Sequence, residues 1–275
     1  MISFHNKTAL ITGGSSGIGK ALALELLNSG CSVIICARDS QKLNSAKDEL
    51  ITNSACESGR VFTLPLDITD FDLVQIKISE FLEVHPTPDI LINCAGSAHP
   101  GEFQDLSMDK FHWLMDVNLF GTIHMTKALL PAMQKRGSGH IVNISSAAGF
   151  VGVYGYTAYC ASKYAVRGFT DALRSELRLN NIQMSLVFPP DTDTPQLVYE
   201  AEYKPPITKA LAGTAGILLP SNVAKTILKG VAKSQYIIVP GLENALLYHL
   251  SNILGPNVYF VMDRMVDSAV KSIKS

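Results

Sequence analysis

The feature that most constrains the fold is an alternation between two hydrophobic periods along the chain. Short β-branched apolar runs recur, and the segments between them carry apolar residues three and four positions apart. The first pattern is typical of strands buried on both faces, and the second of amphipathic helices. We therefore expect a parallel sheet of about seven strands covered by helices on both faces. The expected strands are 8–12, 32–36, 61–65, 90–93, 140–144, 183–188 and 236–240.

Composition narrows the class of protein. The chain has 275 residues, with no internal repeat and no linker rich in Pro, Gly or Ser, so we expect a single domain over residues 1–275. Hydrophobic residues make up 47% and charged residues 17%, which excludes a disordered chain. The net charge of −1 gives no positive field for a polyanion, so no nucleic-acid partner is expected.

The cysteines and the N-terminus bear on location and metal binding. No C-x-x-C pair or histidine ligand spacing occurs, so no metal site is expected. The cysteines are typical of small buried residues in a reducing compartment. The first residues lack a signal-peptide pattern, which predicts a cytoplasmic location. The five cysteines are Cys31, Cys36, Cys56, Cys94 and Cys160.

A glycine-rich turn follows the first expected strand and opens a helix. It runs from Thr12 to Gly19. Glycines permit a sharp turn, let a phosphate approach the backbone, and allow the helix to pack close to the strand. The helix N-terminus adds a partial positive charge. The pattern predicts a doubly wound, Rossmann-like fold that binds a dinucleotide. The cofactor-binding residues expected here are Gly13, Ser15, Ser16, Gly17, Ile18 and Gly19.

The end of the second strand indicates which dinucleotide is bound. It reads Cys36-Ala37-Arg38, and a guanidinium there suits the 2′-phosphate of NADPH or NADP+. Lys42, four residues on and taken to share a helical face with Arg38, would add a second positive charge. Asp39 is an alternative ribose ligand. Asp67, after the third strand, is placed either to bind the adenine amino group or to cap a helix.

A serine pair, a tyrosine and a lysine form the expected catalytic group. Ser145 and Ser146 follow the fifth strand, and Tyr159 and Lys163 lie four residues apart on one helical face. Tyrosine has a reference pKa near 10, so transfer of its proton at neutral pH needs a nearby cation that stabilises the phenolate. Lys163 supplies that cation, and a serine hydroxyl can polarise a substrate carbonyl.

Together these motifs resemble the short-chain dehydrogenases/reductases over about residues 5–240. The resemblance rests on the glycine-rich turn, the N-x-A-G turn that begins at Asn93, Asn118, the serine pair, and the tyrosine and lysine. It implies that Tyr159 transfers the proton and that Tyr159 and Lys163 also belong to the cofactor site, with the nicotinamide beside Tyr159 and its ribose bound by Lys163. Ser146, thirteen residues before the tyrosine, would orient the carbonyl, with Ser145 as the fallback.

The resemblance assigns three further residues. Asn118 would hold a water molecule that links Lys163 to solvent. Asn93 would belong to the cofactor site, and Thr194 would touch the nicotinamide side of the cofactor.

Within the family, the segment Phe188–Pro195 resembles one branch. Pro190 stands where the family usually has glycine, and Tyr156–Tyr159 is similar to the same branch. The branch reduces 3-ketosphinganine to sphinganine with NADPH, so this reaction is the implied function. Two alternatives stay open: a reductase or dehydrogenase of another lipophilic ketone or alcohol, such as a retinoid, a steroid or a 3-ketoacyl thioester, and a non-catalytic NADP(H)-sensing protein.

Two segments are expected to contact the substrate, a membrane or another subunit. Residues 190–220 read as a substrate loop, since Pro195–Pro220 is longer than most connections and carries apolar residues for a lipophilic ketone. Four of its acids are placed to balance a substrate ammonium: Asp191, Asp193, Glu200 and Glu202. The apolar segment 242–275, uncharged over 245–262 and interrupted by Gly255-Pro256, predicts either a peripheral membrane contact or a subunit contact. Family resemblance further implies a homodimer or homotetramer, paired through helices 114–133 and 165–177.

Overall fold

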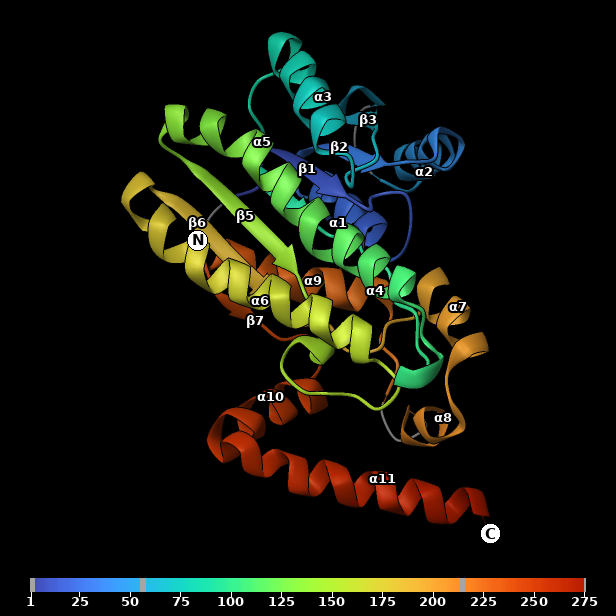
Figure 1. Ribbon diagram of the computed structural model, residues 1–275. Helices are drawn as coiled ribbons and strands as arrows, with labels where there is room; N and C mark the ends of the chain where they lie inside the picture. The colour runs from blue at the N-terminus through green and yellow to red at the C-terminus, as the bar shows by residue number, and fades with distance from the viewer. Residues whose placement is uncertain (1–2, 55–57, 213–215, 275) are drawn as a thin grey trace.

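The structure is a computed structural model that describes residues 3–54, 58–212 and 216–274. Its described strands form one parallel sheet in the order β3-β2-β1-β4-β5-β6-β7 (Figure 1). The order reverses between β1 and β4, and ligands bind beside such a switch point in doubly wound folds. The strands are β1 Thr8–Thr12, β2 Ser32–Ala37, β3 Val61–Pro65, β4 Ile90–Asn93, β5 Gly139–Ile144, β6 Ile182–Val187 and β7 Ile237–Ile238.

The sequence prediction of the sheet is confirmed. The first six strands begin and end within one residue of their expected positions. The seventh is shorter than expected and covers only Ile237 and Ile238. It lies at the edge of the sheet, and Pro240 just beyond it has no N–H with which to continue a ladder.

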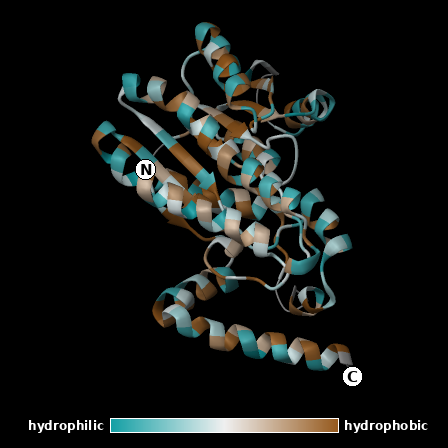
Figure 2. Cartoon of the chain, in the orientation of Figure 1, coloured by the Kyte–Doolittle hydropathy of each residue, from teal (hydrophilic) through white to brown (hydrophobic). Residues whose placement is uncertain are grey.

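Helices cover both faces of the sheet (Figure 1). The alternation of side chains along β1 shows how the two faces are filled: Ala9 and Ile11 pack into one apolar core, and Leu10 packs into the other. The strands accordingly stand out as hydrophobic in Figure 2. One face carries α1 Gly17–Asn28, α2 Ser40–Asn53 and α9 Pro220–Ala232, and the other carries α3 Phe71–Val84, α5 Gly121–Arg136 and α6 Thr157–Leu177.

A π-helical turn interrupts the long helix that the sequence predicted around residues 114–133. Helix α4 covers Met108–Met115, the π turn η3 covers Asp116–Phe120, and α5 follows. Single π turns inside helices are often found at functional sites. The short 3-10 helices are η1 Ser58–Arg60, η2 Phe103–Asp105, η4 Ala147–Gly149, η5 Arg178–Asn180 and η6 Gly255–Asn257.

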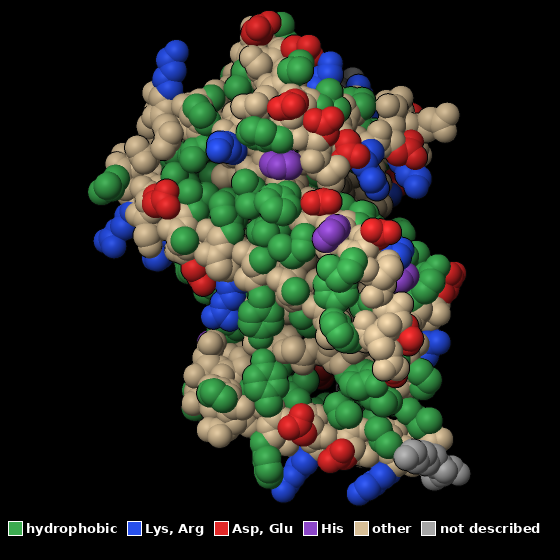
Figure 3. Space-filling view, in the orientation of Figure 1, with side chains coloured by type: hydrophobic (Ala, Val, Ile, Leu, Met, Phe, Trp, Pro, Cys, Tyr) green, Lys and Arg blue, Asp and Glu red, His purple; other side chains and the backbone are tan. Residues whose placement is uncertain are grey.

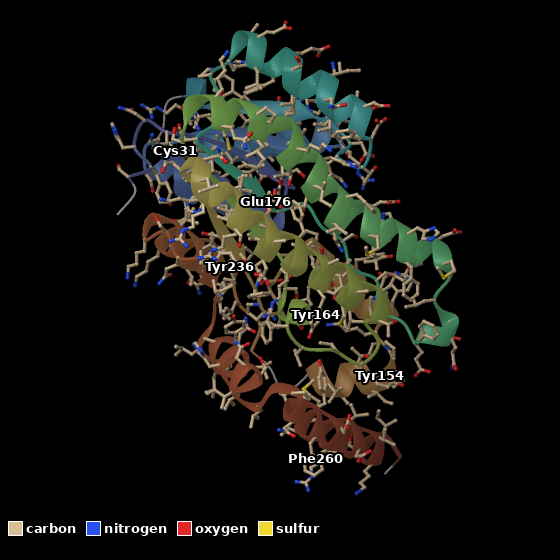
Figure 4. The ribbon with its side chains drawn as sticks, turned by 60° about the vertical axis from the view of Figure 1, so that its left-hand side comes forward. Cys31, Tyr154, Tyr164, Glu176, Tyr236 and Phe260 are labelled. Atoms are coloured by element: carbon tan, nitrogen blue, oxygen red, sulfur yellow. The ribbon has the colours of Figure 1, made fainter. Side chains whose placement is uncertain are left out.

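The expected substrate loop is mostly helical, which corrects the sequence prediction. Helix α7 covers Pro195–Tyr203 and α8 covers Pro206–Ala212, while residues 213–215 and Cys56 lie outside the described residues. Prolines stand at the starts of both helices, where a missing N–H costs no hydrogen bond. Thr194 caps α7. Figure 4 shows Tyr154 beside α8, whose Thr208 hydroxyl donates a hydrogen bond to the Tyr154 carbonyl at 2.9 Å.

The C-terminal segment forms two helices joined at the expected break. These are α10, Leu242–Leu254, and α11, Val258–Lys274, and α11 passes beneath α8 (Figure 1). Hydrophobic side chains gather in this lower part of the molecule (Figure 3). Leu242 is 92% exposed and Phe260 63% exposed, and Figure 4 places Phe260 at the outer edge of α11. No helix among the described residues has the length and apolarity needed to cross a bilayer.

Candidate active site

A cleft of about 420 Å³ opens where the carboxyl ends of the central strands meet. It receives residues from the glycine-rich turn, from the ends of β2, β4 and β5, and from α6 and α7. The predicted site residues that line it are Gly13, Ser15, Ser16, Gly17, Ile18, Gly19, Arg38, Asp67, Ser145, Ser146, Tyr159, Lys163 and Thr194. The structure therefore brings the expected cofactor-binding and catalytic residues into one space.

The glycines of the glycine-rich turn stand at positions that could not accept a side chain without strain or a shift of the turn. Gly13 and Gly17 have φ of +69° and +53°, a region that other residues rarely adopt. A Cβ on Gly19 would lie 2.3 Å from the Gly13 carbonyl oxygen. The first residue before α1, Ser16, makes no side-chain cap, so its side chain does not cover the helix N-terminus. This geometry fits a dinucleotide pyrophosphate held by backbone N–H groups.

The charged residues beside this turn separate into two groups. Arg38 and Asp67 line the cleft, 3.9 Å apart between Nη1 and Oδ2, and Asp67 also accepts hydrogen bonds from Thr69. Asp39 caps α2 by accepting from the backbone N–H groups of Gln41 and Lys42. The Lys42 side chain is 77% exposed, faces Asp39, and does not line the cleft. Arg38 precedes the helix, so the two basic residues do not share a helical face as expected.

Thr194 and Asn93 occupy different environments. Thr194 lies against the glycine-rich turn, its Cγ2 3.1 Å from where a Cβ on Gly17 would stand. Asn93 is buried below the cleft, where its side chain donates to Thr126 and Asn143 at 3.1 and 2.9 Å. Its side chain does not line the cleft, so the position gives no support to direct contact with a cofactor.

The two serines play separate parts. The Ser145 hydroxyl is buried and donates to the Lys163 carbonyl at 2.9 Å. The Ser146 hydroxyl accepts from the Ala148 backbone N–H at 3.2 Å and lies close enough to the Tyr159 hydroxyl to lower its pKa. Burial raises the pKa of Tyr159 and the nearby Glu200 charge raises it further, whereas the Ser146 hydroxyl lowers it. Tyr159 therefore holds its proton at neutral pH, and the geometry favours Ser146 over Ser145 as its partner.

Lys163 lies at the bottom of the cleft. Its Nζ donates to the Ile144 carbonyl at 3.1 Å and lies 5.8 Å from the centre of the Tyr159 ring. Burial lowers the pKa of Lys163 to about 8, so at neutral pH most of the population carries the charge. A phenolate formed on Tyr159 would have this ammonium beside it.

Asn118 lies in the π turn and is buried. Its Oδ1 accepts from the Ser97 backbone N–H at 2.8 Å, and its Nδ2 donates to the Ser97 carbonyl and to the Ser162 hydroxyl. The side chain thus fixes the segment after β4 against α6, and the predicted water relay to Lys163 stays a prediction.

Sequence reasoning assigned no role in the cleft to Tyr156, Gln196 or Trp113, which also line it. Tyr156 donates to the Glu200 carboxylate at 2.5 Å, and Gln196 donates to the other Glu200 oxygen at 2.9 Å. The spacing of three residues between Tyr156 and Tyr159, and of four between Gln196 and Glu200, could have placed each pair on one helix face. Trp113, another lining residue, comes from α4 and has no local signal.

Comparison with known proteins fixes the class. The short chain dehydrogenase family matches residues 7–203, which is most of the chain. The chain belongs to this family. It is 36% identical over 256 residues to a 3-dehydrosphinganine reductase of Danio rerio, covering 93% of this chain and 77% of the relative. It is also 36% identical over 268 residues to a Drosophila melanogaster protein named dehydrogenase/reductase SDR family protein 7-like, covering 96% and 81%.

Solved structures share the fold. A short-chain dehydrogenase from Sphingobium yanoikuyae in complex with NADPH has a TM-score of 0.76 and 26% identity, covering 94% of this chain and 96% of that one. A short-chain dehydrogenase/reductase from Burkholderia phymatum in complex with NAD has a TM-score of 0.79 and 25% identity, covering 92% and 96%. Both dinucleotides thus occur among the structural neighbours.

Proposed function

We propose that the protein reduces 3-ketosphinganine to sphinganine with NADPH. The observation that carries the proposal is that Ser146, Tyr159 and Lys163 line the same cleft as the glycine-rich turn and Arg38. The relatives named 3-dehydrosphinganine reductase support the substrate. A binding protein that only senses the cofactor would not need a serine and a tyrosine beside a buried lysine.

The cofactor would lie along the ends of the central strands. The glycine-rich turn would hold its pyrophosphate, and Arg38 would bind the 2′-phosphate. Asp39, the alternative ribose ligand, is engaged as the cap of α2, which supports NADPH over NADH. When bound, NADPH supplies the hydride that adds to the substrate's carbonyl carbon.

The residues of the chain supply the proton and hold the ketone. Ser146 and the Tyr159 hydroxyl would donate hydrogen bonds to the carbonyl oxygen, and Tyr159 would pass its proton to that oxygen as the alcohol forms. The Lys163 ammonium would stabilise the phenolate left behind. Proton return through Asn118 is part of the proposal.

The wall of the cleft near Tyr159 suits an alkyl chain. Its apolar lining residues come from α4, the π turn, the segment before α6, and α7. Their burial of a long chain would contribute about 25 cal/mol per Å² of apolar surface removed from water. These residues are Trp113, Val117, Val153 and Leu197.

Membrane contact and assembly are also proposals. The exposed apolar side chains of α10 and α11 support a peripheral contact with lipid, from which a long-chain ketone would be drawn. The alternative is a subunit contact in a homodimer or homotetramer.

The test follows the loss of reduced-nicotinamide absorbance with purified protein. 3-Ketosphinganine is compared with a retinoid, a steroid ketone and a 3-ketoacyl thioester, each with NADPH and with NADH. The proposal predicts rapid consumption of NADPH with 3-ketosphinganine. NADPH consumption with another ketone but not with 3-ketosphinganine would assign a different substrate. NADPH binding without consumption would indicate a protein that only senses the cofactor.

A further inference from the structure

A buried carboxylate lies in the cleft beside the proton donor. Glu200, on α7, is 6% exposed and lines the cleft. Its Oε2 accepts from the Tyr156 hydroxyl at 2.5 Å, and its Oε1 accepts from the Gln196 amide at 2.9 Å. Each oxygen has one neutral donor and retains lone pairs for a further one.

The charge of this carboxylate is only partly balanced by the protein, because the Lys204 ammonium lowers its pKa without forming an ion pair with it. In the described part of the chain, no Lys, Arg or His forms an ion pair with Glu200. The nearby Lys204 instead pairs with Asp191, at 3.7 Å. Burial raises the pKa of Glu200, and the Tyr156 and Gln196 hydrogen bonds and the Lys204 charge offset only part of that rise. A buried charge of this kind is costly unless it gains a partner of opposite sign.

The carboxylate is close to the reacting group. The rings of Tyr156, which holds Glu200, and Tyr159 are 5.8 Å apart between centroids. The Glu200 charge also raises the pKa of Tyr159. A ligand that carries a cation on the carbon next to its carbonyl could therefore reach both residues. The ammonium of 3-ketosphinganine lies on the carbon next to the ketone.

The other acids of this segment are less suited. Asp191 lines the cleft but is paired with Lys204. Asp193 and Glu202 are exposed and do not line the cleft. Of the four acids predicted from the sequence to balance an ammonium, the structure leaves Glu200.

We propose that Glu200 binds the protonated amine of a 2-amino-3-ketone substrate and so places the neighbouring carbonyl against Tyr159. This inference rests on the proposed function and adds the group that recognises the substrate. Tyr156 acts as a positioning residue, because it fixes the carboxylate from the start of the catalytic helix. No cation on the cofactor competes for this place, since NADPH is an anion.

The first test uses the unmodified protein. Its kcat/KM is measured with 3-ketosphinganine and with 1-hydroxyoctadecan-3-one, which has the same chain and no amine. The amine should raise kcat/KM by about 10–100-fold, the range for a hydrogen bond to a charged group. Equal values for the two ketones would overturn the role of Glu200. Turnover of neither ketone would refute the proposed function itself.

The second test compares Glu200→Gln with Glu202→Gln, a change on an exposed turn of the same helix. Glu200→Gln keeps the shape and an acceptor for Tyr156 but removes the charge. Because loss of the charge also acts on Tyr159 with either ketone, the readout is the ratio of kcat/KM for the amine-bearing ketone to that for the amine-free ketone, which should fall about 10–100-fold. Glu202→Gln should leave this ratio unchanged. Equal losses on both ketones, or weakened NADPH binding, would show a structural role and overturn the inference.

Discussion

The two walls of the cleft are built in different ways. The cofactor wall is built mainly from the continuous glycine-rich turn, where a methyl group on Gly13 or Gly19 would meet neighbouring backbone. The substrate wall is made of side chains from distant segments, such as Tyr156 and Glu200, which are 44 residues apart. A site for an invariant pyrophosphate can therefore be formed by residues adjacent in sequence, whereas a site for one substrate depends on tertiary packing.

The two walls should respond differently to substitution. An added atom in the cofactor wall should weaken NADPH binding, and with it the reduction of every substrate. A change of charge or polarity in the substrate wall should act on the chosen ketone and leave the cofactor bound. Tyr159 lies where the walls meet.

The largest effect is expected for Tyr159→Phe. The substitution removes the proton donor and keeps the ring, so kcat should fall by about 10³-fold while NADPH affinity changes less than about threefold. Stopped assays of sphinganine formation and NADPH titration measure the two. The matched control is Tyr164→Phe, on the same helix but on its exposed side. A Tyr159→Phe variant with full activity would refute the role of this hydroxyl.

Gly19→Ala probes the cofactor wall. The new Cβ would lie 2.3 Å from the Gly13 carbonyl oxygen, so the turn must shift. NADPH affinity should fall by about 10–100-fold, as typical strain from overpacking allows. Gly168→Ala, on α6 with no atom within 4 Å of the new Cβ, should bind NADPH normally and gain up to about 1 kcal/mol of stability. Equal affinities in the two variants would break the contrast between the walls.

Arg38→Ala tests whether the protein distinguishes NADPH from NADH through the 2′-phosphate. Loss of the guanidinium should weaken NADPH binding by about 10–30-fold and NADH binding by less than about twofold. Lys42→Ala should change NADPH affinity less than about twofold, because the structure places Lys42 beside Asp39 and outside the cleft. Fluorescence titration with both cofactors measures these values. A larger loss for Lys42→Ala than for Arg38→Ala would reverse the assignment.

The smallest effect is a dependence on pH. Burial lowers the pKa of Lys163 to about 8 in the free protein, so its charge is present below that pH and lost above it. Because the charge stabilises the Tyr159 phenolate, kcat/KM for reduction should fall as pH rises through about 8. Lys163→Arg keeps its charge at higher pH and should remove this alkaline decline, at a lower rate. An unchanged decline in that variant would assign it to another group.

The sequence predicted the cofactor wall well for a physical reason. The strand ends, the glycine-rich turn, Arg38 and the serine, tyrosine and lysine are short-range patterns, and the parallel sheet brings strand ends together at one edge. The interpretation failed where local rules were extended too far. Lys42 was placed on a helical face with Arg38, although α2 begins only at Ser40.

The substrate wall was harder to predict. Residues 195–220 were interpreted as one long loop, although prolines stand in the first turns of α7, α8 and α9, where proline is well tolerated. The distinction between Glu200 and Glu202 depends on how α7 packs against the start of α6, which hydrophobic periodicity does not predict.

The cofactor-site prediction for Asn93 depended on a buried contact in the same way. Its side chain does not line the cleft, because it joins a buried polar network with Asn143 and Thr126.

The most direct test of hydride transfer from NADPH to 3-ketosphinganine follows the hydrogen that reaches the substrate. Purified protein is incubated with 3-ketosphinganine and NADPH deuterated at the transferable position of the nicotinamide, and the product is analysed by mass spectrometry. The account predicts sphinganine with one deuterium on the former carbonyl carbon. Cofactor oxidation without deuterium in sphinganine, or no sphinganine at all, would contradict it.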